Sequence, residues 1–288
     1  GIRPSSPHTA TSPSLNCKYY QNVNIRFKRW LNFELFDKTS INCSTDGGVT
    51  WNKIWDNNNY VRDLNWNNIN YNISQQATRK ANLQLRISID SSDNSGDYGG
   101  WNIDNFAITA DHITKDLGVS GITSPITHCS MGSETVTVKI KNFGELPVSD
   151  PFQVGYSINN GSTYTYATIN PTINSEDEYT YSFTTLANLS QPGLKQLKFK
   201  TVLPGDEDVS NDTYSTTLFV YPTLNYAYQN SFESSNGYWN PSGANSTWAW
   251  GLPAATLINT ASDGTKAWVT NLKGYHAQSE VSYLESPC

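Results

Sequence analysis

Hydrophobic and polar residues alternate one by one along several stretches of the chain, which is the period of a β-strand with one buried face. Val23, Ile25 and Phe27 fall on one side of such a strand, with polar residues between them. The segments 81–89 and 134–144 repeat the pattern with aliphatic residues at every second position. No segment shows the helical period as clearly. We therefore expect a chain built from strands.

Turn signals join these strands into hairpins. Residues 39–55 read as strand, Asp-Gly-Gly turn and strand, and residues 152–164 place Asn-Asn-Gly between two alternating runs. Short alternating segments with turns between them continue through residues 116–221, where we expect about seven strands, the spacing typical of a β-sandwich. Residues 66–81 leave room for a single helical turn.

The two ends of the chain differ from this centre. Residues 1–14 are rich in Pro, Ser and Thr and are expected to be a linker. Residues 229–253 are dense in Trp, Gly and Asn, and residues 266–288 predict one strand, a turn and the start of another.

Composition agrees with an all-β chain and excludes some partners. Of the 288 residues, 12% are aromatic and 15% are charged, and the length favours two or three domains. The net charge of −6 comes without any basic run, so we expect no nucleic-acid partner. No window approaches the ~20 apolar residues of a membrane span. The first residues lack the apolar core of a signal peptide, so we expect a removed signal or a piece of a longer chain.

The four cysteines are Cys17, Cys43, Cys129 and Cys288, and none of them forms a CxxC pair. A zinc site is therefore disfavoured. A disulfide between Cys17 and Cys43 is one alternative in an oxidising compartment. The other is that the cysteines are isolated and act as small hydrophobic residues.

Several motifs carry a resemblance to a known family. Residues 12–110 resemble the second half of bacterial MAM-like jelly rolls, including the group called choice-of-anchor J. The matching stretches are NVNIRFKRWLNFE (22–34), STDGGVTWNKIW (44–55), LQLRISIDSSD (83–93) and GGWNIDNFAI (99–108). Residues 230–288 resemble the first half of the same domain. The matching stretches there are NSFESSNGYW (230–239), WAWGLP (248–253), ASDGTKAWVTNLKGYH (261–276) and SYLESPC (282–288).

The centre of the chain is similar to another module. TVTVKIKNFGELPVS (135–149) and LPGDEDVSNDTYS (203–215) resemble the bacterial adhesion-related immunoglobulin-like module called CARDB. The resemblances together imply an all-β fold in which MAM-like jelly-roll halves flank an immunoglobulin-like sandwich. The implied parts are a linker at 1–14, a second half at 15–111, a sandwich at 116–221 and a first half at 226–288.

The implied order, second half before first half, leaves two interpretations. The chain is a window on a longer repetitive protein, or residues 226–288 complete a jelly roll with residues 12–110 of the same or a neighbouring chain. A half jelly roll exposes unpaired strand edges and half of a core. We therefore expect neighbouring copies or repeats of the same protein as partners.

The resemblance also implies a structural cation, calcium or sometimes sodium, that ties the first strand of this domain type to the last. It places ligands at Glu233, Asp263 and Asp104. Hard cations take six to eight oxygen ligands at ~2.3–2.6 Å, so carboxylates far apart in sequence can share one ion.

A second candidate metal loop contains Asp90, Asp93 and Asp97, but its spacing lacks the EF-hand pattern and a closing Glu. The alternative is a polar turn whose Asp and Ser side chains cap the backbone. The acidic segment 205–212 leaves the same two interpretations, a calcium loop or a solvated turn.

No catalytic motif is present, because the histidines lie far apart and neither a nucleophile elbow nor an HExxH sequence occurs. We therefore expect no enzymatic activity. Trp239, Trp248 and Trp250, with Tyr238, are candidates for stacking on sugar rings. The alternative is that these side chains pack into the fold.

These observations favour a non-catalytic segment of a large repetitive bacterial protein that is secreted or held at the cell surface. Its expected role is adhesion, filament formation or surface structure, with surface glycans as candidate partners. The alternatives are the accessory region of a secreted hydrolase, in particular a peptidase, and a carbohydrate-binding module.

Overall fold

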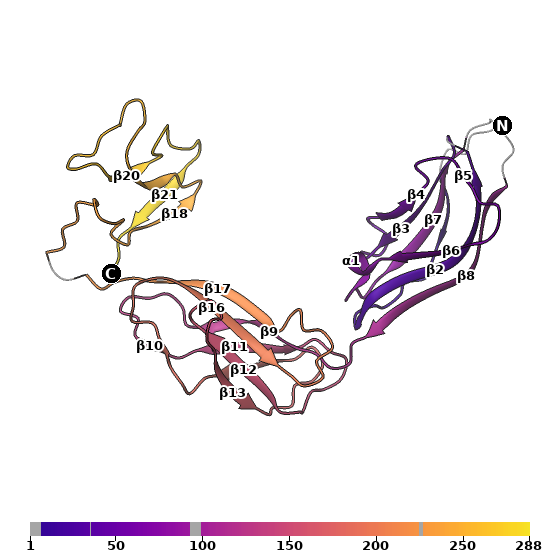
Figure 1. Cartoon of the computed structure of the whole chain (residues 1–288), viewed down its shortest axis with the longest axis horizontal. Helices are drawn as coiled ribbons and strands as arrows, with labels where there is room; N and C mark the ends of the chain where they lie inside the picture. The colour runs from indigo at the N-terminus through magenta and orange to yellow at the C-terminus, as the bar shows by residue number, and fades with distance from the viewer. Residues whose placement is uncertain (1–6, 35, 93–98, 225–226) are drawn as a thin grey trace. The chain divides into compact units, whose positions relative to one another are not determined.

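The computed structural model describes residues 7–34, 36–92, 99–224 and 227–288. These residues form an almost entirely β structure (Figure 1), which confirms the fold class expected from the alternation. The chain divides into two compact units. The first consists of Gly1–Asp116 with the short segments Phe143–Pro147 and Asn174–Glu176, and the second holds the other residues.

The N-terminal unit contains two antiparallel sheets. The strands of the first sheet lie in the order β1 (His8–Thr11), β7 (Gln84–Ser91), β3 (Lys38–Ser44) and β4 (Asn52–Asp56). The strands of the second sheet are β2 (Tyr20–Phe33), β5 (Val61–Arg62), β6 (Asn67–Asn72) and β8 (Gly100–His112). Because β6 and β8 pair with the same part of β2, they lie on opposite sides of it. The expected helical turn is α1 (Ser74–Ala77).

Alternation along β2 sets the buried face of the second sheet. Val23, Ile25 and Phe27 are buried, as their spacing predicts. They form a hydrophobic cluster with residues of the other sheet, among them Leu83 and Leu85. Burial of each such side chain contributes about 1.5–3 kcal/mol. This cluster is what holds the two sheets together.

The turn between β3 and β4 has the chemistry that the Asp-Gly-Gly sequence predicts. Asp46 accepts the backbone N–H groups of Val49 and Thr50 at 3.0 and 2.9 Å. Gly47 and Gly48 have φ angles of +75° and +89°, where a side chain would strain the backbone. The predicted hairpin is confirmed.

Two features of this unit correct the expectations. Residues 8–11 form strand β1, which pairs antiparallel with β7, and so they are not linker. All four side chains of β1 are exposed, which explains why no apolar alternation marked the strand. Cys17 and Cys43 are free and buried, so the disulfide between them is wrong and the alternative of isolated hydrophobic cysteines is confirmed for this pair.

The second unit contains an immunoglobulin-like arrangement of two facing sheets. One sheet has the order β14 (Glu178–Ser182), β11 (Thr137–Asn142) and β9 (Leu117–Ser124). The other has the order β13 (Thr165–Ile169), β12 (Phe152–Ser157), β16 (Gly193–Val202) and β17 (Thr213–Val220). These are the seven strands expected, and the two-residue strands β10 (Ser133–Glu134) and β15 (Ala187–Asn188) pair as an additional ribbon.

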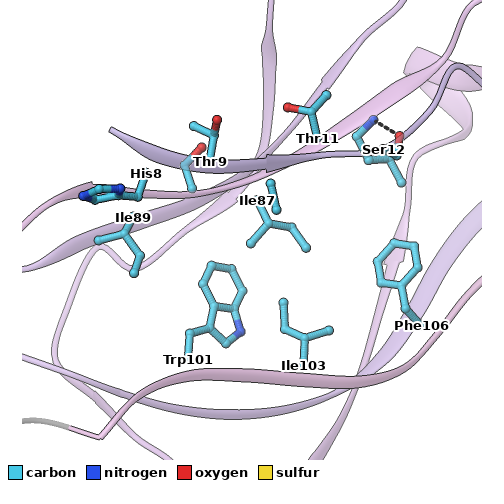
Figure 2. A pocket seen from close by; sticks show the side chains of 12 residues that line it. His8, Thr9, Thr11, Ser12, Ile87, Ile89, Trp101, Ile103 and Phe106 are labelled. Atoms are coloured by element: carbon cyan, nitrogen blue, oxygen red, sulfur yellow. Dashed lines mark hydrogen bonds between the residues drawn. The ribbon is translucent and has the colours of Figure 1, made fainter. Parts of the chain in front are cut away.

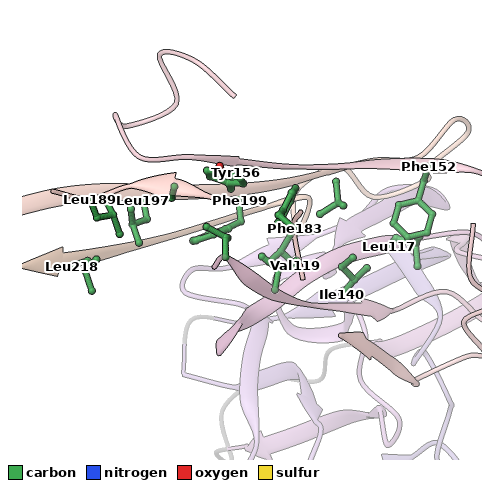
Figure 3. Close-up of a cluster of buried hydrophobic side chains, with 14 of the residues drawn as sticks. Leu117, Val119, Ile140, Phe152, Tyr156, Phe183, Leu189, Leu197, Phe199 and Leu218 are labelled. Atoms are coloured by element: carbon green, nitrogen blue, oxygen red, sulfur yellow. The ribbon is translucent and has the colours of Figure 1, made fainter. Parts of the chain in front are cut away.

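The core of this sandwich is continuous from one sheet to the other. Val136, Val138 and Ile140 are all buried, as their alternation predicts. Figure 3 shows Ile140 with Phe152 and Phe199 in this cluster, which draws on both sheets. Phe152 and Phe199 are each 1% exposed, so the sandwich is closed to solvent at its centre.

Residues 227–288 form two ribbons. β18 (Asn240–Ala244) pairs with β21 (Val281–Glu285), and β19 (Trp248–Gly251) pairs with β20 (Ala267–Thr270). Among the residues described beyond Val220, none belongs to a buried hydrophobic cluster. This segment therefore lacks a core of its own.

A disulfide between Cys129 and Cys288 ties the end of this segment to the sandwich. Next to it, the N–H of Leu224 donates to the carbonyl of Cys288 at 2.6 Å. The compact second unit accordingly includes residues 226–288 with the sandwich. The sequence did not predict this pairing, because the two cysteines lie far apart, with a sequence separation of 159.

Candidate functional sites

An open groove lies between the two sheets of the N-terminal unit. β1 and β7 form one wall, and β8 forms the other. The cavity has a volume of about 620 Å³. Figure 2 shows the side chains that line it from both walls, among them Ile87, Ile89, Trp101, Ile103 and Phe106.

The groove continues the hydrophobic cluster of this unit beyond the point where the cluster closes. All four aliphatic residues of 81–89 were expected to point inward, and Leu83 and Leu85 are 0% and 3% exposed. Ile87 and Ile89 lie further along the same strand but are only partly buried. The two sheets thus present matching apolar faces with space between them.

The environment of the Trp101 indole also indicates that packing at the groove is incomplete. Its ring packs edge-on against Trp55, with the ring centroids 5.8 Å apart. Its Nε1 atom is buried and has no hydrogen-bond acceptor among the residues that the structure describes. A buried indole N–H without a partner costs about 1–3 kcal/mol. The groove would be stabilised by an occupant that brings apolar side chains.

The acidic stretch at the end of β7 lies only partly within the described residues. Asp90 is exposed, and Asp93 and Asp97 lie outside the described residues. Asp104 lies in β8, opposite Lys28 of β2, and accepts the backbone N–H of Asn105 at 2.7 Å. Within the described ranges, no group of three or more His, Cys, Asp or Glu side chains could hold a metal ion.

Glu233 reaches the turn that the resemblance assigned to the same ion. Its Oε2 accepts the N–H of Thr265 at 2.9 Å, and its Oε1 accepts the N–H of Lys266 at 2.8 Å. These backbone donors, Lys266 first, lower the pKa of the carboxyl. A Cβ added to Gly264 would lie 2.2 Å from the Glu233 carboxyl carbon, so another residue there would displace the Glu233 carboxylate, and the φ of +66° would strain it. Asp263 is the exposed residue just before this glycine.

The structure thus places Glu233 beside the turn of Asp263, with both of its oxygens used as acceptors from the backbone. This arrangement anchors the turn whether or not an ion is bound. Asp104 belongs to the other compact unit. A calcium ion shared by the three carboxylates stays a prediction.

The acidic segment 205–212 packs against the sandwich. Asp206 accepts the N–H of Leu117 at 3.0 Å, and Asp212 accepts the hydroxyl of Thr201 at 3.1 Å. Asp212 is 7% exposed. Burial, followed by the charge of Asp206, raises the pKa of Asp212 to about 6. The segment is therefore a hydrogen-bonded part of the fold with one destabilised carboxylate.

The three candidate tryptophans do not share one environment. Trp239 packs against Phe232, with ring centroids 6.2 Å apart. Trp250 donates from Nε1 to the carbonyl of Phe232 at 2.8 Å, and Lys266 lies over its ring. Trp248 lines a separate cavity of about 370 Å³ in this segment. Sugar stacking by these residues stays a prediction.

Sequence analysis did not identify one further hydrogen-bonded carboxylate of this segment. Glu280 accepts the N–H and the hydroxyl of Thr247 at 2.9 and 2.7 Å and the N–H of Ala277 at 3.1 Å. Hydrogen bonds, first that of Ser282, lower the pKa of Glu280 to about 2. No motif surrounds it, so only its three-dimensional partners reveal it. Because this segment has no core, hydrogen bonds to Glu280 and Glu233 help to hold its two ribbons.

Comparison with known proteins gives one sequence relative of part of the chain. No family model matches the chain. Bacillopeptidase F of Bacillus subtilis (strain 168) is 41% identical over 83 residues, which are 29% of this chain and 6% of that protein. The chain thus spans a small fraction of the length of this relative.

Two solved structures are distant neighbours of the chain. A CARDB domain from Pyrococcus furiosus in complex with di-metal ions has a TM-score of 0.31 and 20% identity, over 37% of this chain and 89% of that one. A β-glucuronidase of Bacteroides uniformis has a TM-score of 0.29 and 13% identity, over 74% of this chain and 26% of that one. At such scores, neither neighbour carries a conclusion about function.

The described part of the chain contains no helix that is long and apolar enough to cross a membrane.

Proposed function

We propose that this chain is a non-catalytic region of a larger bacterial protein that acts outside the cell. Its role is adhesion, filament formation or surface structure. Its incomplete β-modules pack against neighbouring copies or repeats of the same protein. A calcium ion binds the completed module and links its two parts.

The observation that carries this proposal is that two regions of the chain have incomplete hydrophobic cores. The N-terminal unit holds an apolar groove of about 620 Å³ between its two sheets. Residues 227–288 expose apolar side chains without a buried cluster of their own. Leu257, Ile258 and Tyr275 are 80%, 69% and 76% exposed. Exposed apolar surface on this scale is typical of an interaction site.

The two surfaces are complementary in kind. The groove accepts apolar side chains between two sheets, and the C-terminal ribbons offer such side chains together with free strand edges. An unpaired strand edge is a template for pairing with another chain. Packing of the ribbons of one copy into the groove of the next would fill the groove with apolar side chains and give the free strand edges a partner. Such head-to-tail contacts generate rings or filaments.

The 41% identity with a segment of Bacillopeptidase F favours a second candidate function. In this alternative, the chain is an accessory region of a peptidase whose catalytic domain lies in another part of the protein. The alternatives differ in whether the incomplete cores bind another copy.

Light scattering coupled to size-exclusion chromatography tests the self-association directly. We expect the full chain to form concentration-dependent oligomers, and Ile103→Lys, which charges the groove, to be monomeric. Thr109→Lys places the same charge on an exposed position of the same strand and should leave the oligomers intact. Monomers of the unmodified chain at every concentration would contradict the proposal.

A further inference from the structure

The outer face of the second sheet of the N-terminal unit carries an ordered grid of polar side chains. Val23, Ile25 and Phe27 point into the core, so Arg26 and Lys28 between them point outward. Cross-strand partners share a face of a sheet. The outer face therefore has rows that cross β6, β2 and β8, and we call it the asparagine face.

The rows follow from the strand register. Asn70 lies opposite Arg26 and Asn68 lies opposite Lys28, both across the β6 side of β2. Successive rows recur about every 6.8 Å, two residues of ~3.4 Å each, and neighbouring strands are ~4.8 Å apart. The remaining polar members of the face, from the same registers, are Asn24, Asn32, Arg62, Asn72, Asn102, Asp104 and Thr109.

An aromatic pair stands in this grid. Trp30 follows Lys28 two residues on along β2 and lies opposite Asn102 of β8. Trp66 packs edge-on against Trp30, with ring centroids 6.0 Å apart. Trp66 is 42% exposed. An exposed indole next to amide groups offers an apolar surface and hydrogen-bonding groups at one place.

The charged members of the grid are not neutralised within the unit. Across the described residues, Arg26 and Lys28 have no ion pair or side-chain hydrogen bond. Asp104 lies across from Lys28 in register, but no ion pair joins them. The amides of Asn68 and Asn70 likewise make no side-chain hydrogen bond in this part of the structure. These donors and acceptors are available to a ligand.

We propose that the asparagine face binds an extended acidic polysaccharide. The indole of Trp66 would stack on the C–H face of a sugar ring, and the amides of Asn68 and Asn70 would pair with vicinal hydroxyl groups. Arg26 and Lys28 would pair with carboxylate groups of the sugar chain. This site is distinct from the tryptophans of residues 227–288. The polysaccharide would be the ligand for adhesion, so this inference rests on the proposed function.

An exposed sheet face suits a linear ligand better than a small one. Each sugar gains little on an exposed face, so several neighbouring sugars must bind together. A peptide partner would require apolar anchors, which this face lacks apart from the tryptophan pair. Its many hydrogen-bonding groups match a hydroxyl-rich chain instead.

Biolayer interferometry on immobilised polygalacturonate, with dextran as the neutral reference, tests the proposal on the full chain. We expect binding to polygalacturonate that weakens as salt rises, because exposed charges are screened. Trp66→Ala and the double variant Arg26→Gln/Lys28→Gln should each raise the Kd at least tenfold.

Matched controls lie in the second unit. Lys198 and Lys200 alternate with buried residues of β16 as Arg26 and Lys28 do in β2. Tyr166 is 46% exposed and stacks on Tyr164, as Trp66 packs on Trp30. Lys198→Gln/Lys200→Gln and Tyr166→Ala should leave the Kd unchanged. Melting curves of all variants report whether each one is folded.

Three results would overturn the inference: no binding to polygalacturonate, equal binding to dextran, or equal losses in the control variants. The groove variant Ile103→Lys separates this inference from self-association. If Ile103→Lys changes the oligomeric state and keeps polysaccharide binding, the two properties are independent. Oligomers bind an immobilised ligand more tightly through avidity. The Kd of monomeric Ile103→Lys is therefore compared with the Kd of the double variant Ile103→Lys/Trp66→Ala.

Discussion

The sandwich of the second unit and the N-terminal unit both consist of two facing antiparallel sheets, but their cores end differently. The sandwich buries Phe152 and Phe199 almost completely. In the N-terminal unit, the cluster closes around Leu83 and Leu85 and opens at Ile87 and Ile89. Two facing sheets are therefore not enough for a closed core. The facing side chains must also come into contact with each other along the whole length of the strands.

The first and largest expected effect compares one aromatic residue from each core. Phe152→Ala should lower the free energy of unfolding by about 3–5 kcal/mol, because it leaves a cavity in a closed core. Phe106→Ala, at the open groove where Phe106 is already 42% exposed, should cost clearly less. Denaturant unfolding followed by tryptophan fluorescence measures both. Equal losses would mean that the groove is as tightly packed as the sandwich.

A second effect concerns a buried carboxyl group of the acidic segment that packs against the sandwich. The pKa of Asp212 is raised to about 6, above its unfolded value near 3.8. The folded chain therefore holds this proton more tightly, and stability falls as the pH rises from about 4 to 6. Asp212→Asn keeps an acceptor for Thr201 and removes the titration. Its gain at pH 7 should reach up to about 3 kcal/mol.

Thermal melts of both proteins from pH 4 to pH 7, in the presence of a chelator, check this prediction. The two curves should converge near pH 4 and separate as the pH rises. Parallel curves over the whole range would contradict it. Because the effect belongs to the sandwich, Ile103→Lys should not alter the separation.

The smallest effect tests whether an ion completes the open modules. If calcium binds only the completed module, it should stabilise by about 2.7 kcal/mol at a hundredfold excess over its Kd. Chelator should then lower the melting temperature or the oligomer size, and Asp104→Asn should have the same effect as chelator. The sandwich transition should not respond. If neither chelator nor Asp104→Asn changes melting or oligomer size, the shared calcium site is wrong.

Local patterns predicted most of the strands but not their long-range partners. Alternation identified the buried faces of Val23 and Val138, because burial along a strand has a period of two residues. It did not distinguish the closed position of Leu85 from the open position of Ile87, which depends on what faces them from the other sheet. Strand β1 was missed because an exposed edge strand needs no apolar residue.

The candidate sites were predictable to different degrees. The resemblance placed Glu233 near the turn of Asp263, and the structure brings Glu233 to that turn through the N–H groups of Thr265 and Lys266. The roles of Asp206 and Glu280 depend on hydrogen-bond partners that no spacing reveals. The asparagine face was visible as alternating polar residues, but only the strand register shows which of them share a row.

The disulfide between Cys129 and Cys288 also decides how the chain carries a mechanical load. A pull applied at Cys288 and resisted in the N-terminal unit passes through the sulfur bridge to residue 129. It bypasses the 158 residues enclosed between the two cysteines, one fewer than their sequence separation of 159. β11 to β17 and both C-terminal ribbons would then stay folded under tension. Of the sandwich strands, only β9 lies on the loaded path.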